Sequence, residues 1–312
     1  MRTGQIAGKN GPVTLSKLVL GCDFTSRLSK DEFFHLMDRY YAAGGRTLDT
    51  ARIYGASESE KTVGAWISSR GVRKEITLIT KGGHPPIGRM HESRLSDGCI
   101  KSDCEESLRA LGVDSVDVYF LHRDDPARPV SEIMDTLHDL VADGKVRALG
   151  ASNWSLQRIL EANRYAVGAG KTPFSVSQIQ WSLALCTSES WGDDTLVCMT
   201  DAEYAGYRDA GIPVMAFSPQ GKGFFSKYIA GGREALSEKV KARFLNDVNL
   251  RRAEKVRRLS EQTGLTPAAL VLTYLTCNPL ECFAVIGCSS MSQLEDSLTA
   301  ADAVVDPSLL AD

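Results

Sequence analysis

Thr47-Leu48-Asp49-Thr50-Ala51-Arg52-Ile53-Tyr54-Gly55 is a short apolar strand that runs into a loop. We expect the strand to end at Asp49 and a sharp turn to bring Tyr54 back beside it. A carboxylate and a phenol held together at the mouth of a fold could form a proton-transfer site, if a cation and an imidazole lie near them.

Two later strands supply these partners. Lys81 follows the apolar strand expected at 75–80, and His122 follows the one expected at 116–121. Each polar residue therefore lies at the C-terminal end of a different strand. In a barrel of parallel strands, these ends meet on one face.

Short apolar strands alternate with amphipathic helices along most of the chain, which predicts a parallel sheet with right-handed crossovers. The strands are apolar throughout, as expected when both faces of a sheet are covered. We expect strands at 17–21, 46–49, 75–80, 116–121, 146–151, 175–179, 213–217 and 282–286. We expect helices at 30–43, 57–69, 96–111, 130–142, 156–167, 200–209, 251–263, 267–276 and 292–300.

Eight such units predict an α/β fold, a closed (β/α)8 TIM barrel forming a single domain over residues 1–312. A small strand or hairpin is expected within 12–18, and a long irregular loop region at about 218–248. A doubly wound open sheet is the alternative. It is less favoured because no strand is followed by GxGxxG, the usual pyrophosphate loop of that fold.

The composition is that of a globular protein, with 43% apolar and 24% charged residues. A net charge of −3 gives no reason to expect binding to nucleic acid or membranes. There is no apolar run of roughly 18 residues and no apolar signal core within residues 1–10, so we expect a cytoplasmic protein. The eight cysteines form no CxxC pair and show no zinc spacing, so we expect reduced thiols and no metal site.

The chemistry of the four polar residues follows from their pKa values. A phenol with a pKa near 10 is a poor acid, and a nearby ammonium group favours the phenolate and lowers that pKa. Asp49 would pair with Lys81 and keep it charged at an otherwise costly buried position. His122 could donate a hydrogen bond to a carbonyl oxygen. Each residue alone has an ordinary structural explanation, but the four together favour an active site.

The motifs around these residues resemble the aldo-keto reductase family. Leu48–Gly55 with Ser57 and Glu58 is similar to the family's Asp–Tyr signature, and Asp117–Arg123 to its His strand. The remaining motifs that match are Gly144–Asn153, Gln178–Trp181, Ala216–Pro219 and Val285–Gly287. The resemblance extends over roughly residues 15–300.

The resemblance implies an NAD(P)H-dependent oxidoreductase that interconverts aldehydes or ketones and alcohols. Tyr54 would be the general acid, assisted by Lys81 and Asp49, and His122 would orient the substrate. The partner would be a small carbonyl or alcohol compound, sugar-like ones included. The oligomeric state is left open.

The resemblance also implies a set of cofactor-binding residues. Ser152, Asn153 and Gln178 would hold the nicotinamide carboxamide, and Phe217 would stack on its ring. The pyrophosphate would be lined by Ser218, Gln220 and Gly221, and the adenosine end by Gly287, Cys288, Gln293, Asp296 and Ser297.

One departure concerns the choice of cofactor. NADP(H) is the family default, but residues 287–297 lack Lys and Arg and contain Glu295 and Asp296. Arginine and lysine are the natural partners of a 2′-phosphate, whereas a carboxylate near the ribose suits NAD. NAD(H) is therefore the alternative, unless Arg251 or Arg252 reaches the phosphate. Ser297 also replaces a more usual Asn at the adenine.

Two other functions remain open. One is a Schiff-base lyase or isomerase barrel with Lys81 as nucleophile. The other is a regulatory subunit that binds the nucleotide with little turnover.

Substrate choice should depend on the loops at 22–28, 82–95, 123–129 and 218–248. Within and near these loops, we expect His84 and His91 to lie on the loop surface. Asp124 and Asp125 could contact substrate or serve as caps. Trp154 and Trp181 could line the pocket or pack in the core, and the sequence favours neither position.

Overall fold

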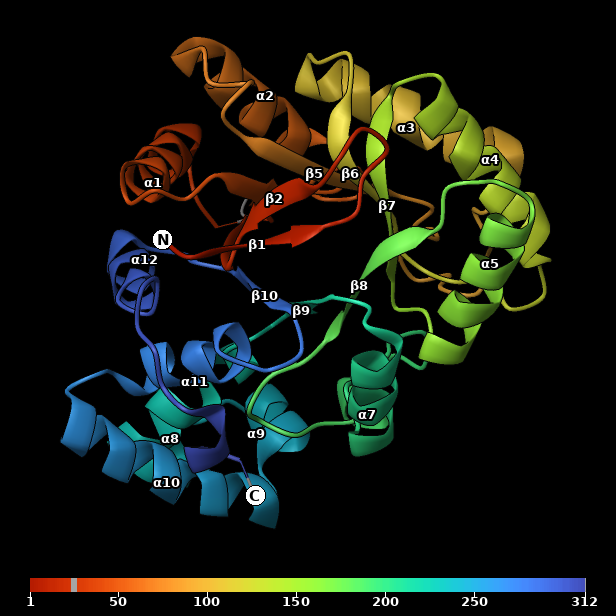
Figure 1. Ribbon diagram of the computed structural model, residues 1–312. Coiled ribbons are helices and arrows are strands. Elements are labelled where there is room, and N and C mark those ends of the chain that lie inside the picture. Colours follow the sequence, from red (N-terminus) through yellow and green to blue (C-terminus); the bar gives the residue numbers. More distant parts are fainter. Residues whose placement is uncertain (24–26, 312) are drawn as a thin grey trace.

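Eight parallel strands close into a barrel in the computed structural model, which describes residues 1–23 and 27–311 (Figure 1). The barrel strands are β3 (Leu18–Gly21), β4 (Thr47–Asp49), β5 (Thr77–Gly82), β6 (Val116–Leu121), β7 (Val146–Ser152), β8 (Phe174–Gln180), β9 (Val214–Phe217) and β10 (Cys282–Ile286). Each strand pairs with the next, and β10 closes the ring onto β3. The predicted (β/α)8 barrel is confirmed.

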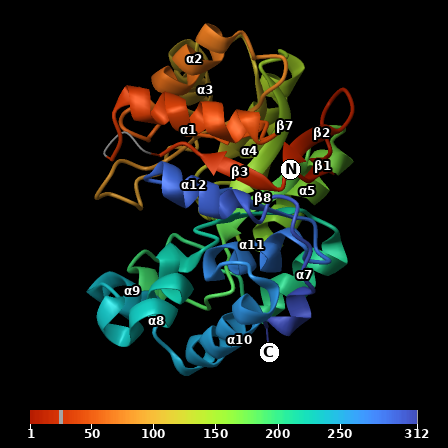
Figure 2. The same ribbon diagram turned by 90° about the vertical axis from the view of Figure 1, so that its left-hand side faces the viewer.

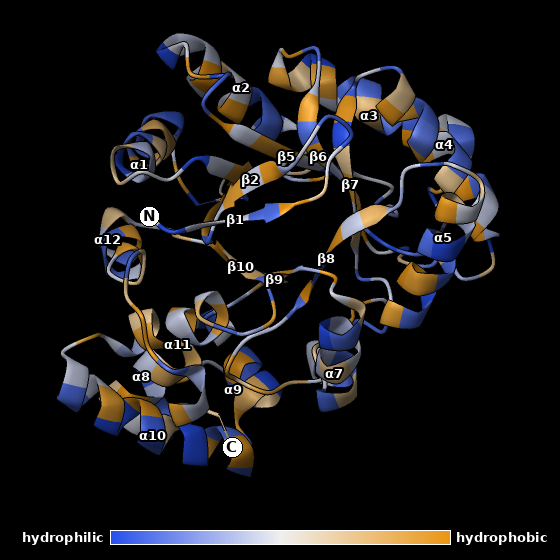
Figure 3. Ribbon diagram, in the orientation of Figure 1, coloured by the Kyte–Doolittle hydropathy of each residue, from blue (hydrophilic) through white to orange (hydrophobic). Residues whose placement is uncertain are grey.

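Helices surround this barrel (Figure 1). They are α1 (Lys30–Ala42), α2 (Glu58–Arg70), α3 (Asp97–Leu111), α4 (Val130–Ala142), α5 (Leu156–Gly168), α6 (Ser188–Trp191), α7 (Asp201–Ala210), α8 (Phe224–Gly231), α9 (Glu238–Phe244), α10 (Asp247–Thr263), α11 (Pro267–Thr276) and α12 (Met291–Leu298). Short 3-10 turns add η1 (Gly221–Gly223), η2 (Gly232–Ala235) and η3 (Pro307–Leu309). Hydrophilic residues lie mainly on these outer helices (Figure 3).

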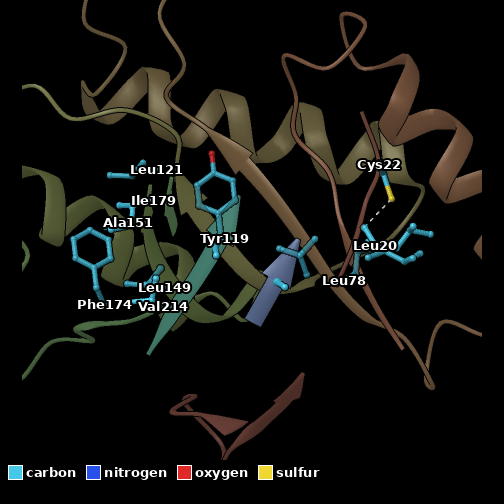
Figure 4. Packing of buried hydrophobic residues seen from close by; sticks show 14 of the residues in the cluster. Leu20, Cys22, Leu78, Tyr119, Leu121, Leu149, Ala151, Phe174, Ile179 and Val214 are labelled. Carbon is cyan, nitrogen blue, oxygen red and sulfur yellow. Dashed lines mark hydrogen bonds between the residues drawn. The ribbon is translucent and has the colours of Figure 1, made fainter. Parts of the chain in front are cut away.

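The alternation of side chains along each strand separates two buried layers. One set, including Ile79, Val118 and Phe120, packs inside the barrel. The intervening residues, such as Leu78 and Tyr119, belong to a larger cluster that also contains helix residues such as Leu36. Figure 4 labels ten members of this cluster. Because side chains alternate along a strand, these inward residues determine which polar residues near the strand ends also point inward.

A hairpin of β1 (Thr3–Ile6) and β2 (Val13–Ser16) lies across the N-terminal end of the barrel (Figures 1 and 2). Val13 and Leu15 belong to the cluster that fills the barrel interior. The hairpin starts earlier than the 12–18 segment expected from the sequence. It closes one end, so the opposite, C-terminal end is the open one.

The prediction of an irregular region at 218–248 was wrong. The segment contains α8 and α9, the turns η1 and η2, and the start of α10. Phe224, Phe225 and Phe244 are buried there in a second apolar cluster shared with α10 and α11. Gly221, Gly223, Gly231 and Gly232 break this helical pattern into pieces too short to recognise by periodicity. These helices lie together to one side of the barrel (Figure 2).

None of the helices in residues 1–23 and 27–311 combines the length and the apolar character needed to cross a membrane.

Gly64 allows a close approach between α2 and the end of α3. A Cβ built on Gly64 would lie 2.2 Å from the carbonyl oxygen of Leu111, which is backbone and cannot rotate away. We expect Gly64→Ala to reduce the free energy of unfolding by roughly 1–3 kcal/mol, because the helices must move apart. Urea denaturation followed by circular dichroism measures this.

Gly98, in the first turn of α3, is the matched control because a Cβ there meets nothing within 4 Å. Gly98→Ala should leave the stability unchanged or increase it by up to about 1 kcal/mol. Equal effects of the two substitutions would contradict the close-approach argument.

Candidate active site

Four polar side chains converge at the open end of the barrel. Asp49 is the last residue of β4, Tyr54 lies in the following turn, and His122 directly follows β6. Lys81 lies inside β5, because this strand runs two residues beyond the end expected from the sequence. It shares the inward face with Ile79, two residues earlier.

Lys81 and Asp49 form a buried ion pair. Lys81 Nζ donates to Asp49 Oδ2 at 2.6 Å and to the Thr50 carbonyl at 3.0 Å. The side chains are 0% and 2% exposed. Nζ also lies 3.5 Å from Tyr54 Oη, so the ammonium links the carboxylate to the phenol.

This environment raises the pKa of Lys81. Burial by itself would lower it, but attraction to Asp49 and Tyr54 and the hydrogen bonds to both outweigh that effect. Lys81 therefore stays an ammonium at neutral pH.

Tyr54 is half-buried, and its turn is strained. Gly55, Ala56 and Ser57 all have positive φ values of 57°, 52° and 70°. This conformation is uncommon for the two non-glycine residues, and it reverses the chain directly after Tyr54.

The pKa of Tyr54 is raised, which differs from the expectation that Lys81 would lower it. Burial raises it most, and Lys81 lowers it by less. The phenol therefore remains protonated at neutral pH.

His122 is a neutral imidazole. Burial, together with the positive charges of Lys81, His84 and Arg123, holds its pKa well below the usual 6.5. Its ring contacts Tyr54 edge-on, with centroids 5.8 Å apart. His122 Nδ1 is buried without a hydrogen-bond partner among the described residues. The neutral ring also lines the cavity described below.

Contrary to expectation, His84 does not lie on the loop surface. Its ring packs against that of His122, with the centroids 4.7 Å apart. Its pKa is lowered, chiefly by burial. His91 does lie exposed, near Asp194. The described part of the chain contains no cluster of three His, Cys, Asp or Glu residues suited to a metal.

A cavity of about 810 Å³ opens above this cluster. Asp49, Tyr54 and His122 line it, whereas Lys81 lies beneath the wall. Ten of the twelve expected cofactor residues also line it: Ser152, Asn153, Gln178, Phe217, Ser218, Gln220, Gly287, Gln293, Asp296 and Ser297.

The other two expected cofactor residues do not line the cavity. Cys288 is buried in the apolar layer with Ile286 and Leu294. Gly221 is buried, and a Cβ there would lie 2.9 Å from the side chain of Ala184. The sequence pattern alone did not distinguish wall residues from the layer behind them.

Hydrogen bonds orient the polar residues at the strand ends. Gln178 Nε2 donates to Asp49 Oδ1 at 3.3 Å. Asn153, with a φ of 59°, donates from Nδ2 to the carbonyl of His122 at 3.3 Å and to Ser152 Oγ at 3.1 Å. These contacts link β8 to β4, and the end of β7 to the end of β6.

Several cavity residues were not anticipated. Arg123 donates to the carbonyl of His122 at 3.0 Å and forms an ion pair with Asp193 at 3.3 Å. Trp191 and Leu196 come from the segment after β8. Five further basic side chains line the cavity, namely Arg27, Lys222, Lys227, Lys239 and Arg243. Among these residues, only Arg123 could have been anticipated from the sequence, because it directly follows His122.

Arg251 and Arg252 do not line the cavity. Arg252 donates to the carbonyl of Leu183 at 2.8 Å. At the end of the cavity formed by 287–297, Asp296 accepts a hydrogen bond from Thr266, and Gln220 donates to Ser297 Oγ at 3.3 Å.

The remaining loop candidates have structural roles. Trp154 and Trp181 are buried in the core, and neither lines the cavity. Asp124 pairs with Arg158 at 3.3 Å, and burial raises its pKa to about 6. Asp125 accepts from the backbone N–H of Ala127 at 3.1 Å. Of the expected substrate loop 22–28, residues 24–26 lie outside the described residues.

Comparison with known proteins places this site in a family. The sequence profile of the Aldo/keto reductase family matches residues 17–311. The chain is 30% identical over 303 residues to norsolorinic acid reductase stcV of Emericella nidulans, covering 92% of this chain and 73% of that protein. It is 28% identical over 281 residues to aldo-keto reductase str7 of Strobilurus tenacellus, covering 88% and 77%.

A shorter match links the chain to an aryl-alcohol dehydrogenase [NADP(+)] of Phanerodontia chrysosporium. The identity is 33% over 167 residues, which is 51% of this chain and 43% of that protein. The family generally uses nicotinamide cofactors. On the strength of the profile and of the match to the reductase from Emericella nidulans, this chain is an oxidoreductase that belongs to the aldo/keto reductase family.

Proposed function

We propose that this enzyme transfers hydride between a nicotinamide cofactor and the carbonyl carbon of a small substrate, with Tyr54 as the general acid. The observation that carries this proposal is the ion pair beneath Tyr54. A protonated phenol lies at the cavity wall, 3.5 Å from an ammonium group that Asp49 holds in place.

The cavity fits such a cofactor. Its volume of about 810 Å³ is in the usual range for ligand sites. Ser152, Asn153 and Gln178 supply hydroxyl and amide groups suited to a carboxamide, and Phe217 supplies an aromatic face nearby. When bound, the cofactor supplies the hydride for reduction or accepts it for oxidation.

The residues of the chain then manage the proton and the developing charge. In reduction, Tyr54 donates its phenol proton to the substrate oxygen. Lys81 stabilises the phenolate that remains, and Asp49 keeps Lys81 charged and oriented. Neutral His122 donates a hydrogen bond that holds the substrate oxygen. Oxidation uses the same groups in reverse.

Aromatic aldehydes, ketones and alcohols are the substrate class that we favour. Trp191 and Leu196 line the cavity together with Tyr54, so an aryl group would find apolar and aromatic contacts. One relative is named an aryl-alcohol dehydrogenase and another a norsolorinic acid reductase. A panel that also contains sugar-like carbonyl compounds would distinguish the two substrate classes.

The geometry argues against Lys81 as a Schiff-base nucleophile. Its amine is fully buried, donates to two oxygens and has a raised pKa, so a neutral amine would be scarce. A regulatory subunit with little turnover would instead reveal itself by tight cofactor binding without activity over the whole carbonyl panel.

Tyr54→Phe should reduce kcat for carbonyl reduction by about 10²–10⁴-fold, because the proton donor is lost. Cofactor affinity, measured by quenching of protein fluorescence, should stay nearly unchanged. Tyr41→Phe removes a surface hydroxyl bound to Glu75 and is the matched control, with activity within twofold of the original. A fully active Tyr54→Phe enzyme would refute the assignment of the acid.

The pH profile of reduction should be flat from about pH 6 to 8. Tyr54 has a raised pKa, so it remains a proton donor until the pH exceeds the usual tyrosine value of about 10, and kcat/KM should fall only above that value. His122 has a pKa well below 6.5, so its titration adds no inflection within this range. An inflection between pH 6 and 8 would contradict the neutral state of His122.

NADP(H) is the proposed cofactor, with weak discrimination against NAD(H). The five basic side chains along the cavity can attract phosphates in general, but the adenosine-side segment 287–297 has no Lys or Arg. Titration with NADPH and NADH should therefore give Kd values within about tenfold, or about 1.4 kcal/mol. A preference for NADPH above 100-fold would mean that a dedicated 2′-phosphate site exists.

A further inference from the structure

We propose that Cys186 and Cys198 form a reversible disulfide when a hydroperoxide oxidises the protein, and that this bond controls one wall of the cavity. The cross-link itself is independent of the proposed function, whereas its effect on turnover rests on that function.

The two thiols already contact each other. Their sulfur atoms are 3.9 Å apart, and the residues are 5% and 8% exposed. A disulfide requires about 2.05 Å, so the sulfurs must approach by roughly 2 Å, a movement on the scale of side-chain rotation. Hydrogen peroxide is small enough to reach them through brief local opening of the loop.

The surroundings distinguish the two sulfurs. Trp191 Nε1 donates to Cys186 Sγ at 3.1 Å, and Arg243 lies over the Trp191 ring at 4.0 Å. The pKa of Cys186 is lowered by hydrogen bonding to Cys198, against the effect of burial, with further help from Trp191 and Arg243. The same contact and burial raise the pKa of Cys198. When protonated, Cys186 donates to Gln180 Oε1 at 3.0 Å. Cys186 is therefore the thiol that reacts first.

The reaction balances with one molecule of hydrogen peroxide. The Cys186 thiolate attacks the peroxide, the O–O bond breaks, and sulfenic acid and hydroxide form. The Cys198 sulfur then attacks the Cys186 sulfur, the S–O bond breaks, and hydroxide leaves with the proton of the Cys198 thiol as water. Two thiols lose two electrons in total, and the peroxide is reduced to two waters.

The pair lies at the base of a loop that forms part of the cavity. Residues 186–198 leave the barrel after β8 and return where Gln180 exchanges backbone hydrogen bonds with Val197 and Met199, at 2.9 and 2.8 Å. Within the loop, Trp191 and Leu196 line the cavity. A bond across the base therefore constrains these wall residues.

The same loop also supports the candidate active site. Asp193 and Thr195 hold Arg123, at 3.3 and 3.0 Å, and the Val197 N–H donates to Asn153 Oδ1 at 3.4 Å. Oxidation displaces the Cys186 sulfur that accepts the hydrogen bond of Trp191. We expect the altered wall to lower kcat/KM by about fivefold or more.

Peptide mapping tests the cross-link without any assay of activity. The full-length protein is treated with one equivalent of hydrogen peroxide, alkylated and digested. Trypsin leaves both cysteines in one peptide, because no Lys or Arg lies between Lys171 and Arg208. A protease that cleaves after Glu189 separates them, so a joined pair of peptides then reports the disulfide. The free-thiol count should fall by two from eight and recover with dithiothreitol.

Activity is measured in parallel on the same samples. Cys198→Ala should keep the basal activity, form no cross-link and lose the peroxide response. Cys99→Ser, which removes a half-exposed thiol elsewhere, should keep both the cross-link and the response. Unjoined peptides after peroxide treatment would overturn the disulfide. An unchanged peroxide response in Cys198→Ala, or a cross-linked protein with undiminished kcat/KM, would overturn its control of the wall.

Discussion

The buried contact between Lys81 and Asp49 is the interaction on which the candidate active site depends. Both side chains are almost fully buried, so each charge is stabilised chiefly by the other, 2.6 Å away. The pair therefore fixes the ends of two neighbouring strands relative to each other. It also sets the electrostatic environment of Tyr54, whose oxygen is the third member of the group. Loss of either partner would leave an uncompensated buried charge beneath the cavity.

The barrel supplies the rigid part of the site, and segments outside it supply most of the wall. Asp49, Lys81, His122 and Gln178 lie on barrel strands or directly after one, so the closed sheet holds them in place. In contrast, the 186–198 loop and the helices within 218–248 bring aromatic and basic side chains over the same opening. This division separates chemistry, which needs fixed geometry, from recognition, which depends on loops. The proposed disulfide belongs to the second part.

Sequence reasoning succeeded where one residue's local pattern determines its place. Apolar runs marked every barrel strand, and Asp49, Tyr54, Lys81 and His122, which follow or lie near the ends of those runs, come together at one end of the barrel. It failed where the structure of a segment depends on residues that are distant in the sequence but adjacent in space. Phe224 and Phe244 form helices because they are buried against α10 and α11, although glycines interrupt their pattern. Trp191 and Arg243 reach the cavity from segments whose course depends on that packing.

The sequence by itself determined the architecture and indicated the four central polar residues, because apolar runs and the polar residues at or near their ends are local properties of the chain. Only the tertiary structure decided the protonation states. Burial outweighs the ammonium of Lys81 and raises the pKa of Tyr54, a balance that depends on every atom around the phenol. It also decided that Cys186 and Cys198 meet, since contact between two thiols is set by the path of the loop between them and not by their spacing in the sequence.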